Sequence, residues 1–120
     1  MAVFLNATLL ATGLLELGLN GAPWLESGAV VYRSNAVWYS SACAPTDTCE
    51  VISPSEPTSA SGHDAVGDYH EISLVWSPSS SAAAAAVAAG SPPVRMVTGV
   101  RTYPGQPSVA VLTQSFPDGL

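Results

Sequence analysis

The stretch that decides the fold is residues 62–76, which read Gly-His-Asp-Ala-Val-Gly-Asp-Tyr-His-Glu-Ile-Ser-Leu-Val-Trp. From Tyr69 onward the side chains fall into two alternating sets, and only the set with Ile72, Leu74 and Trp76 is mostly apolar. A period of two is typical of a strand with one buried face. The pattern therefore predicts a strand that turns these three side chains toward the core and ends at the next proline, which has no N–H to donate.

The composition extends this prediction to the whole chain. Ten glycines and ten prolines accompany abundant serine and threonine, and only 10% of the 120 residues are charged. Such a balance suits short strands joined by turns better than surface helices. We expect a mostly β fold, an antiparallel β-sandwich or part of one, with residues 1–120 forming a single incomplete domain.

The charge balance argues against several classes of partner. The formal net charge is −6, and the only basic side chains are Arg33, Arg95 and Arg101. No basic patch is available to neutralise phosphates, so nucleic acids and anionic membrane surfaces are poor partners. Residues 3–19 are too short and too polar to span a bilayer. They are read as the beginning of a strand region, with a secretory signal as the alternative.

Further strands are predicted along the chain. Leu15, Leu17 and Leu19 alternate with polar residues and run into a turn, after which residues 24–28 form a bridge. Residues 29–40 are read as one strand with a bend at its middle, and residues 53–61 as a surface loop.

The clearest hairpin is predicted near the end of the chain. Residues 94–103 and 108–116 are its strands, and Pro104 and Gly105 fit a type II turn with positive φ at the glycine. The second strand is apolar on both faces, which predicts a place inside a sheet rather than at its edge. If its cover is absent, we expect edge-strand self-association.

A low-complexity segment lies between these predicted strands. Residues 79–93 are mostly serine and alanine, without charge and without a large apolar face. Alanine favours helix locally, but little tertiary packing would hold such a helix. The segment is predicted to be a disordered or weakly helical insertion.

Two cysteines, Cys43 and Cys49, are separated by five residues. They can close a small disulfide loop in an oxidising compartment, and two buried thiols are the alternative. Metal binding by this pair is not expected, because a structural zinc site needs four ligands. The compartment is left open, with an extracellular location or the secretory pathway slightly favoured.

The densest ionisable group is His63, Asp64, Asp68, His70 and Glu71. Mixtures of histidine and carboxylate can bind metal or transfer protons. Alternation along a strand, however, places neighbouring side chains on opposite faces. We therefore expect a solvated turn in which an aspartate accepts backbone N–H bonds, with no catalytic residue, metal site or cofactor.

Aromatic side chains are the candidates for ligand contacts. Flat aromatic faces complement the C–H faces of sugars, and Trp24 and Tyr69 are the residues selected as carbohydrate-binding. For Trp38 and Trp76 a place in the core is preferred, because buried aromatic residues are common in β proteins.

Four segments carry a family resemblance: residues 61–69, 75–76, 98–103 and 114–120. Their order resembles the N-terminal β-sandwich region of large glycoside-hydrolase-like proteins, in the neighbourhood of alpha-galactosidases and raffinose synthases. The resemblance covers roughly half of the chain, and residues 79–89 depart from it. In such enzymes the sandwich precedes a catalytic (β/α) barrel, so no catalytic residue is transferred to this chain.

The resemblance implies a non-catalytic part of a carbohydrate-active protein, with a carbohydrate or an adjacent catalytic domain as its partner. A free-standing surface module that binds glycans or another protein is the alternative. A small independent hydrolase would need the ionisable group around His70 to act as one site.

Overall fold

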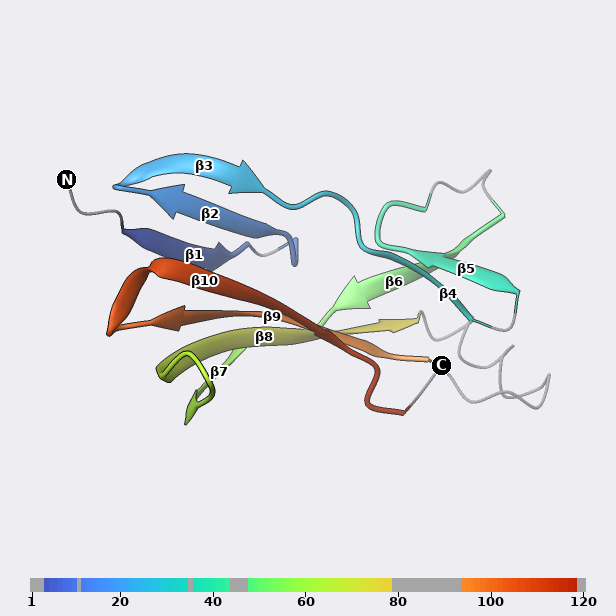
Figure 1. Ribbon diagram of the computed structural model, residues 1–120. Helices are drawn as coiled ribbons and strands as arrows, with labels where there is room; N and C mark the ends of the chain where they lie inside the picture. Colours follow the sequence, from blue (N-terminus) through green and yellow to red (C-terminus); the bar gives the residue numbers. More distant parts are fainter. Residues whose placement is uncertain (1–3, 11, 35, 44–47, 79–93, 119–120) are drawn as a thin grey trace.

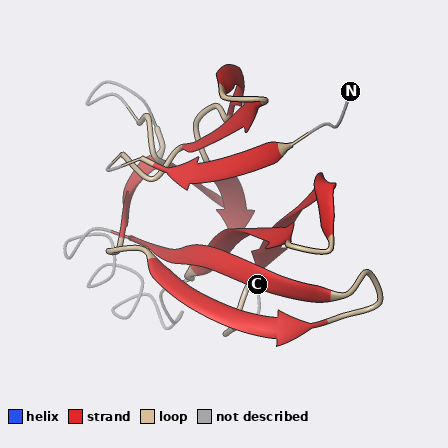
Figure 2. Ribbon diagram, turned by 90° about the vertical axis from the view of Figure 1, so that its left-hand side faces the viewer, coloured by secondary structure: helices blue, strands red, loops and turns tan. Residues whose placement is uncertain are grey.

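The computed structural model describes residues 4–10, 12–34, 36–43, 48–78 and 94–118. Every regular element in these ranges is a strand, as Figure 2 shows, so the prediction of a mostly β fold is confirmed. None of the described residues belongs to a helix that could span a membrane. The insertion predicted at residues 79–93 lies outside the described residues.

The first sheet is an antiparallel meander of β1 (Leu5–Leu9), β2 (Leu15–Leu19) and β3 (Ala22–Glu26). The strand predicted at residues 15–19 is confirmed as β2. The prediction of a bridge at residues 24–28 is wrong in its first half, because β3 pairs with β2. Pro23 is tolerated in β3 because this strand is an edge, where a missing N–H costs little.

The second sheet has seven strands in the order β10-β9-β8-β6-β5-β4, with β7 also paired to β8. Their bounds are β4 (Val31–Ser34), β5 (Val37–Ser40), β6 (Glu50–Pro54), β7 (Thr58–His63), β8 (Asp68–Pro78), β9 (Met96–Tyr103) and β10 (Gln106–Ser115). All pairings are antiparallel except the short parallel pair of β5 and β6.

The strand predicted from Tyr69 is the centre of this sheet. β8 begins at Asp68 and ends at Pro78, as the missing proline N–H predicts. β9 pairs along one side of it, while β7 and β6 share the other side in succession. The loop predicted at residues 53–61 is therefore wrong except at residues 55–57, which connect β6 to β7. Pairing with β8 holds the other residues as strands despite their lack of an apolar pattern.

The region predicted as one bent strand is a hairpin. Residues 31–34 and 37–40 form β4 and β5, and Ala36 in the connection has φ of 63°. An apolar alternation alone does not distinguish a bend from a reversal of the chain. The pairing of Val31 with Ser40 and of Ser34 with Val37 decides for the reversal.

The β9–β10 hairpin is confirmed, but two details differ from the prediction. The turn is two residues long and Gly105 does not have positive φ, so it is not a type II turn. β10 lies at the end of the sheet rather than inside it. A register shift between Gln106 and Ala110 interrupts the strand, and beyond it Leu112 is 62% exposed.

The core lies on one face of the second sheet. Trp76 is fully buried, with Leu74 and Met96 beside it, and its indole Nε1 donates to Thr98 Oγ1 at 2.8 Å. Burial raises the pKa of Tyr32 to about 12, and its hydroxyl donates to the carbonyl of Val94 at 2.7 Å. The predicted inward set is thus confirmed for Leu74 and Trp76. Trp38, which was expected in the core, is 51% exposed.

The first sheet lies beside β9 and β10, as Figure 1 shows, and β1 contacts both strands. The β1–β2 turn packs on the core through Gly13, which has φ of +84°. A Cβ at this position would lie 2.5 Å from the Trp76 ring and 2.9 Å from Pro54. Glycine therefore allows the close approach of the turn to the buried tryptophan.

Candidate functional site

Strand pairing divides the predicted ionisable group between two faces of the sheet. Glu71 bonds Arg101, its partner on β9, whereas His70 bonds Ser61, its partner on β7. The expectation that His70 and Glu71 point to opposite faces is confirmed. The five residues therefore do not form one site.

Asp64 is the centre of the first half. Its Oδ1 accepts the backbone N–H groups of Val66 at 2.8 Å and Gly67 at 3.3 Å, as predicted for an aspartate in a turn. Its Oδ2 accepts the Tyr103 hydroxyl at 2.6 Å and Arg101 Nη1 at 3.0 Å. The hydrogen bond from Tyr103, followed by the backbone and arginine bonds, lowers the pKa of Asp64 to about 2.

Arg101 connects the members of this group, which we call the Asp64 cluster: Asp64, Tyr69, Glu71, Arg101 and Tyr103. Its Nε donates to Glu71 at 2.6 Å, and its guanidinium lies 4.2 Å from the centroid of the Tyr69 ring. The hydrogen bond with Glu71 is the first cause that raises the pKa of Arg101, and the bond with Asp64 raises that of Tyr103. The cluster thus joins the β7–β8 turn to β9.

The other half of the group lies in solvent. His63 Nδ1 is 2.8 Å from Asp68 Oδ1, and these side chains are 73% and 90% exposed. A hydrogen bond of 3.0 Å joins Ser61 Oγ and His70 Nδ1. Both pairs are direct cross-strand partners of β7 and β8. Among the residues that the structure describes, no three His, Cys, Asp or Glu side chains are placed to hold a metal.

The chemistry of these pairs is limited by their geometry. A serine nucleophile needs a base that a third group orients and an oxyanion hole near the hydroxyl. Within the described ranges no carboxylate hydrogen-bonds His70. In the Asp64 cluster both carboxylates accept hydrogen bonds from Arg101, and Asp64 accepts another from Tyr103, so they brace the sheet rather than present a free base.

The selected aromatic residues lie on different sheets. Trp24 is on β3 and is 53% exposed, whereas Tyr69 is on β8 and half-buried. Arg101 covers one face of the Tyr69 ring and Tyr103 meets its edge. The structure does not bring the two residues together, and their carbohydrate-binding role stays a prediction. Trp38 adds another exposed aromatic surface, with Arg33 5.7 Å from its ring centroid.

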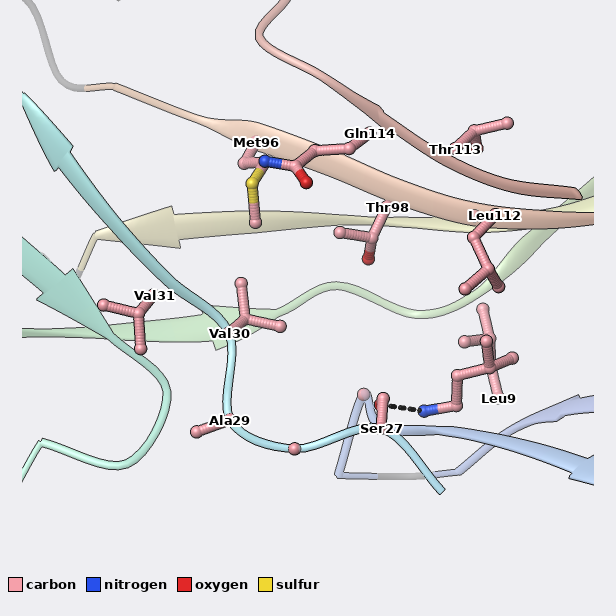
Figure 3. A pocket seen from close by; sticks show the side chains of 14 residues that line it. Leu9, Ser27, Ala29, Val30, Val31, Met96, Thr98, Leu112, Thr113 and Gln114 are labelled. Carbon is pink, nitrogen blue, oxygen red and sulfur yellow. Dashed lines mark hydrogen bonds between the residues drawn. The ribbon is translucent and has the colours of Figure 1, made fainter. Parts of the chain in front are cut away.

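A pocket of about 400 Å³ lies between the first sheet and the β9–β10 hairpin. Figure 3 shows Leu9 and Leu112 on opposite walls, with Val30 and Met96 further along. Thr98, whose Oγ1 already accepts from Trp76, supplies a polar edge. All the lining residues are uncharged. The pocket can therefore accept apolar groups but offers no acid or base.

Cys43 and Cys49 form a disulfide with a Cα–Cα distance of 5.9 Å. The bridge closes the connection between β5 and β6, which are parallel neighbours. The structure thus places these residues in the arrangement that the disulfide interpretation requires, and it ties two strands of the second sheet at their ends.

Sequence reasoning missed Arg101 and Tyr103 as partners of the ionisable group. Their i, i+2 spacing on a predicted strand shows that they share a face, and this signal could have been used. It could not show which face of β8 they meet, because this depends on register. The pocket had no sequence signal, since its walls come from residues as distant as Leu9 and Leu112.

No family model, curated protein or solved structure matches the chain. The resemblance to the sandwich region of glycoside-hydrolase-like proteins is neither supported nor contradicted by these comparisons, and it stays a prediction.

Proposed function

We propose that this chain is the non-catalytic β-sandwich portion of a carbohydrate-active, glycoside-hydrolase-like protein, in which it contacts a catalytic barrel. The motif order around residues 61–69 and 98–103 supports this proposal, as does the presence of two sheets that meet beside β9 and β10. In this arrangement the two sheets are the layers of a sandwich, and the chain contributes support rather than chemistry.

One observation carries the proposal. Within the ionisable group, Asp64 and Glu71 both accept hydrogen bonds from Arg101, while the pocket is lined by uncharged residues alone. Hydrolysis of a glycosidic bond canonically uses two carboxyl groups that flank the scissile bond. Asp64 and Glu71 are instead joined through Arg101, which donates a hydrogen bond to each. A supporting role fits this arrangement better than catalysis.

The reading frame beyond Leu120 is the direct test. A continuing frame that encodes a (β/α) barrel with paired carboxylates supports the proposal, and the barrel should then be more soluble when expressed together with residues 1–120. A stop codon at this point contradicts the proposal, as does a barrel whose stability does not change when this chain is present.

The alternative is a free-standing module that binds glycans or another protein through exposed aromatic side chains. Trp24 and Trp38 favour it, because each exposes about half of its surface. The guanidinium of Arg33 beside Trp38 could donate hydrogen bonds to sugar oxygens while a pyranose ring packs on the indole.

A glycan array on the folded chain separates the two functions. The module predicts binding that falls by about tenfold or more in Trp24→Ala or Trp38→Ala. Val66→Ala, which trims another exposed apolar side chain away from these aromatics, is the control and should bind as the parent does. Tyr69→Phe tests the second selected residue without removing its ring. If the parent chain binds no glycan, the result supports the first proposal, in which the chain is a non-catalytic portion of a larger enzyme.

A further inference from the structure

β10 is an open edge of the seven-stranded sheet. Among the described strands it pairs with β9 alone, so the backbone N–H and C=O groups on its other side meet no strand partner. β1 contacts β10 without pairing with it. Unpaired edges of this kind are templates for the addition of another strand.

This edge lacks the features by which proteins usually protect an edge strand. Residues 110–115 carry no charge and no proline, and the register shift of β10 ends before them. The other edges differ: β1 is only five residues long, β3 carries Pro23 and Glu26, β4 is four residues long and carries Arg33, and β7 has small side chains up to His63. β10 is thus the long, uncharged edge of the described structure.

The pocket reaches this edge. Three consecutive residues of β10, Leu112, Thr113 and Gln114, line it. Side chains of a strand alternate between faces, so Leu112 and Gln114 share the face that bears the pocket, while Thr113 points away from it in Figure 3. Leu112 is the most exposed of the large apolar side chains described. It lies where the pocket meets β10, opposite Leu9 in Figure 3.

We propose that two copies of the chain associate by antiparallel pairing of β10 with β10, centred on Leu112. The segment is complementary to itself in this register: Val111 lies opposite Thr113 and Ala110 opposite Gln114, with no like charges in contact. Pairs of β-branched residues across strands are favourable. The two Leu112 side chains meet and cover the mouths of both pockets. The inference does not depend on the proposed function.

Sedimentation of the whole chain over about a hundredfold range of concentration tests the proposal. The mass should rise from 12.2 kDa to twice this value. Added salt should strengthen the dimer, because it screens the repulsion between two chains of net charge −6 while the interface itself is uncharged. A monomer over the whole range overturns the proposal.

Leu112→Lys should weaken the dimer by about tenfold or more, since two lysines would face each other in the interface. Leu25→Lys is the matched control, because Leu25 is also an exposed leucine on an edge strand and lies outside the interface. It should dimerise as the parent does. Equal weakening by both variants, or by neither, overturns the pairing.

A cross-linking variant keeps the test valid if lysine disturbs folding. Leu112→Cys should form a covalent dimer under mild oxidation, because directly opposite residues in an antiparallel pair are within disulfide reach. Leu25→Cys should not. If the Leu112→Cys chain dimerises but does not form the disulfide, the proposed register is wrong. If β10 pairs only with a different protein, the proposal that its partner is a second copy of the chain is wrong.

Discussion

The hydroxyl of Tyr103 donates a hydrogen bond of 2.6 Å to Oδ2 of Asp64, a residue 39 positions earlier in the chain. The bond connects the end of β9 with the turn between β7 and β8, and it is the largest cause of the low pKa of Asp64. A pair that looks like part of an active site thus serves to fix one end of the sheet.

This relationship predicts how stability depends on pH. The pKa of Asp64 falls from 3.8 in an unfolded chain to about 2 in the fold, so ionised Asp64 stabilises the fold fully above pH 3.8. The contribution is lost progressively as the pH falls from 3.8 toward about 2, where the folded carboxylate also takes up a proton. Urea unfolding at several pH values should show this loss.

Tyr103→Phe removes the main cause of the shift and should raise the pKa of Asp64 toward its ordinary value. NMR titration of the Asp64 carboxyl carbon measures this directly. In Asp64→Asn the acid loss between pH 3.8 and about 2 should be smaller than in the parent. An unchanged Asp64 titration in Tyr103→Phe would show that the hydroxyl does not control it.

The buried hydrogen bond between Trp76 and Thr98 is the second target. Thr98→Val keeps the shape of the side chain but leaves the indole N–H without an acceptor, which should lower the free energy of unfolding by about 1–3 kcal/mol. Urea midpoints at constant slope measure the change. In a Trp76→Phe background, where the donor is absent, the same substitution should have little effect. Equal losses in both backgrounds would contradict this assignment.

Two glycines with nearly equal φ form a matched pair. Gly13 and Gly21 have φ of +84° and +85°, but only Gly13 packs against Trp76 and Pro54. Gly21→Ala should cost about 1–2 kcal/mol of stability from backbone strain alone. Gly13→Ala should cost a further 1–3 kcal/mol or so, because its Cβ would overlap the ring. Equal losses in the two variants would show that the turn can move away from Trp76.

Reduction of the Cys43–Cys49 disulfide should lower stability. The bridge closes a short loop, and the loss of unfolded-chain entropy on closing such a loop is worth about 2 kcal/mol. Urea unfolding with and without reductant measures it. The variant with both cysteines replaced by serine should resemble the reduced parent and should not respond to reductant. If reductant also lowers the stability of this variant, the loss does not come from the disulfide.

Some strands could be predicted from the sequence in more detail than others. Trp76 and Leu74 are predicted in the core because they belong to the mostly apolar one of the two alternating sets of β8, and both are buried. The same reasoning failed for Trp38, because its alternation fits either face and only the packing of Tyr32 and Tyr39 shows which is covered. A local pattern indicates that a strand has two unequal faces, and its neighbours decide which one is buried.

The candidate site shows the same limit. The division between His70 and Glu71 follows from the period of two and was predicted. The pairing of Glu71 with Arg101 requires the register of β8 against β9, and a shift by one residue would place Arg101 on the other face. β7 was missed because its small polar residues form a strand only where β8 supplies the backbone partners.

By itself the sequence determined the β class, the inward places of Leu74 and Trp76 on β8, the final hairpin and the scarcity of basic residues, because these depend on neighbours in the chain and on composition. Only the tertiary structure decided that β10 is an edge, that Asp64 meets Arg101 and Tyr103, and that Leu9 and Leu112 line one pocket. The physical reason is that strand order and register arise from backbone hydrogen bonds between distant segments, and these bonds are the same for nearly every residue type.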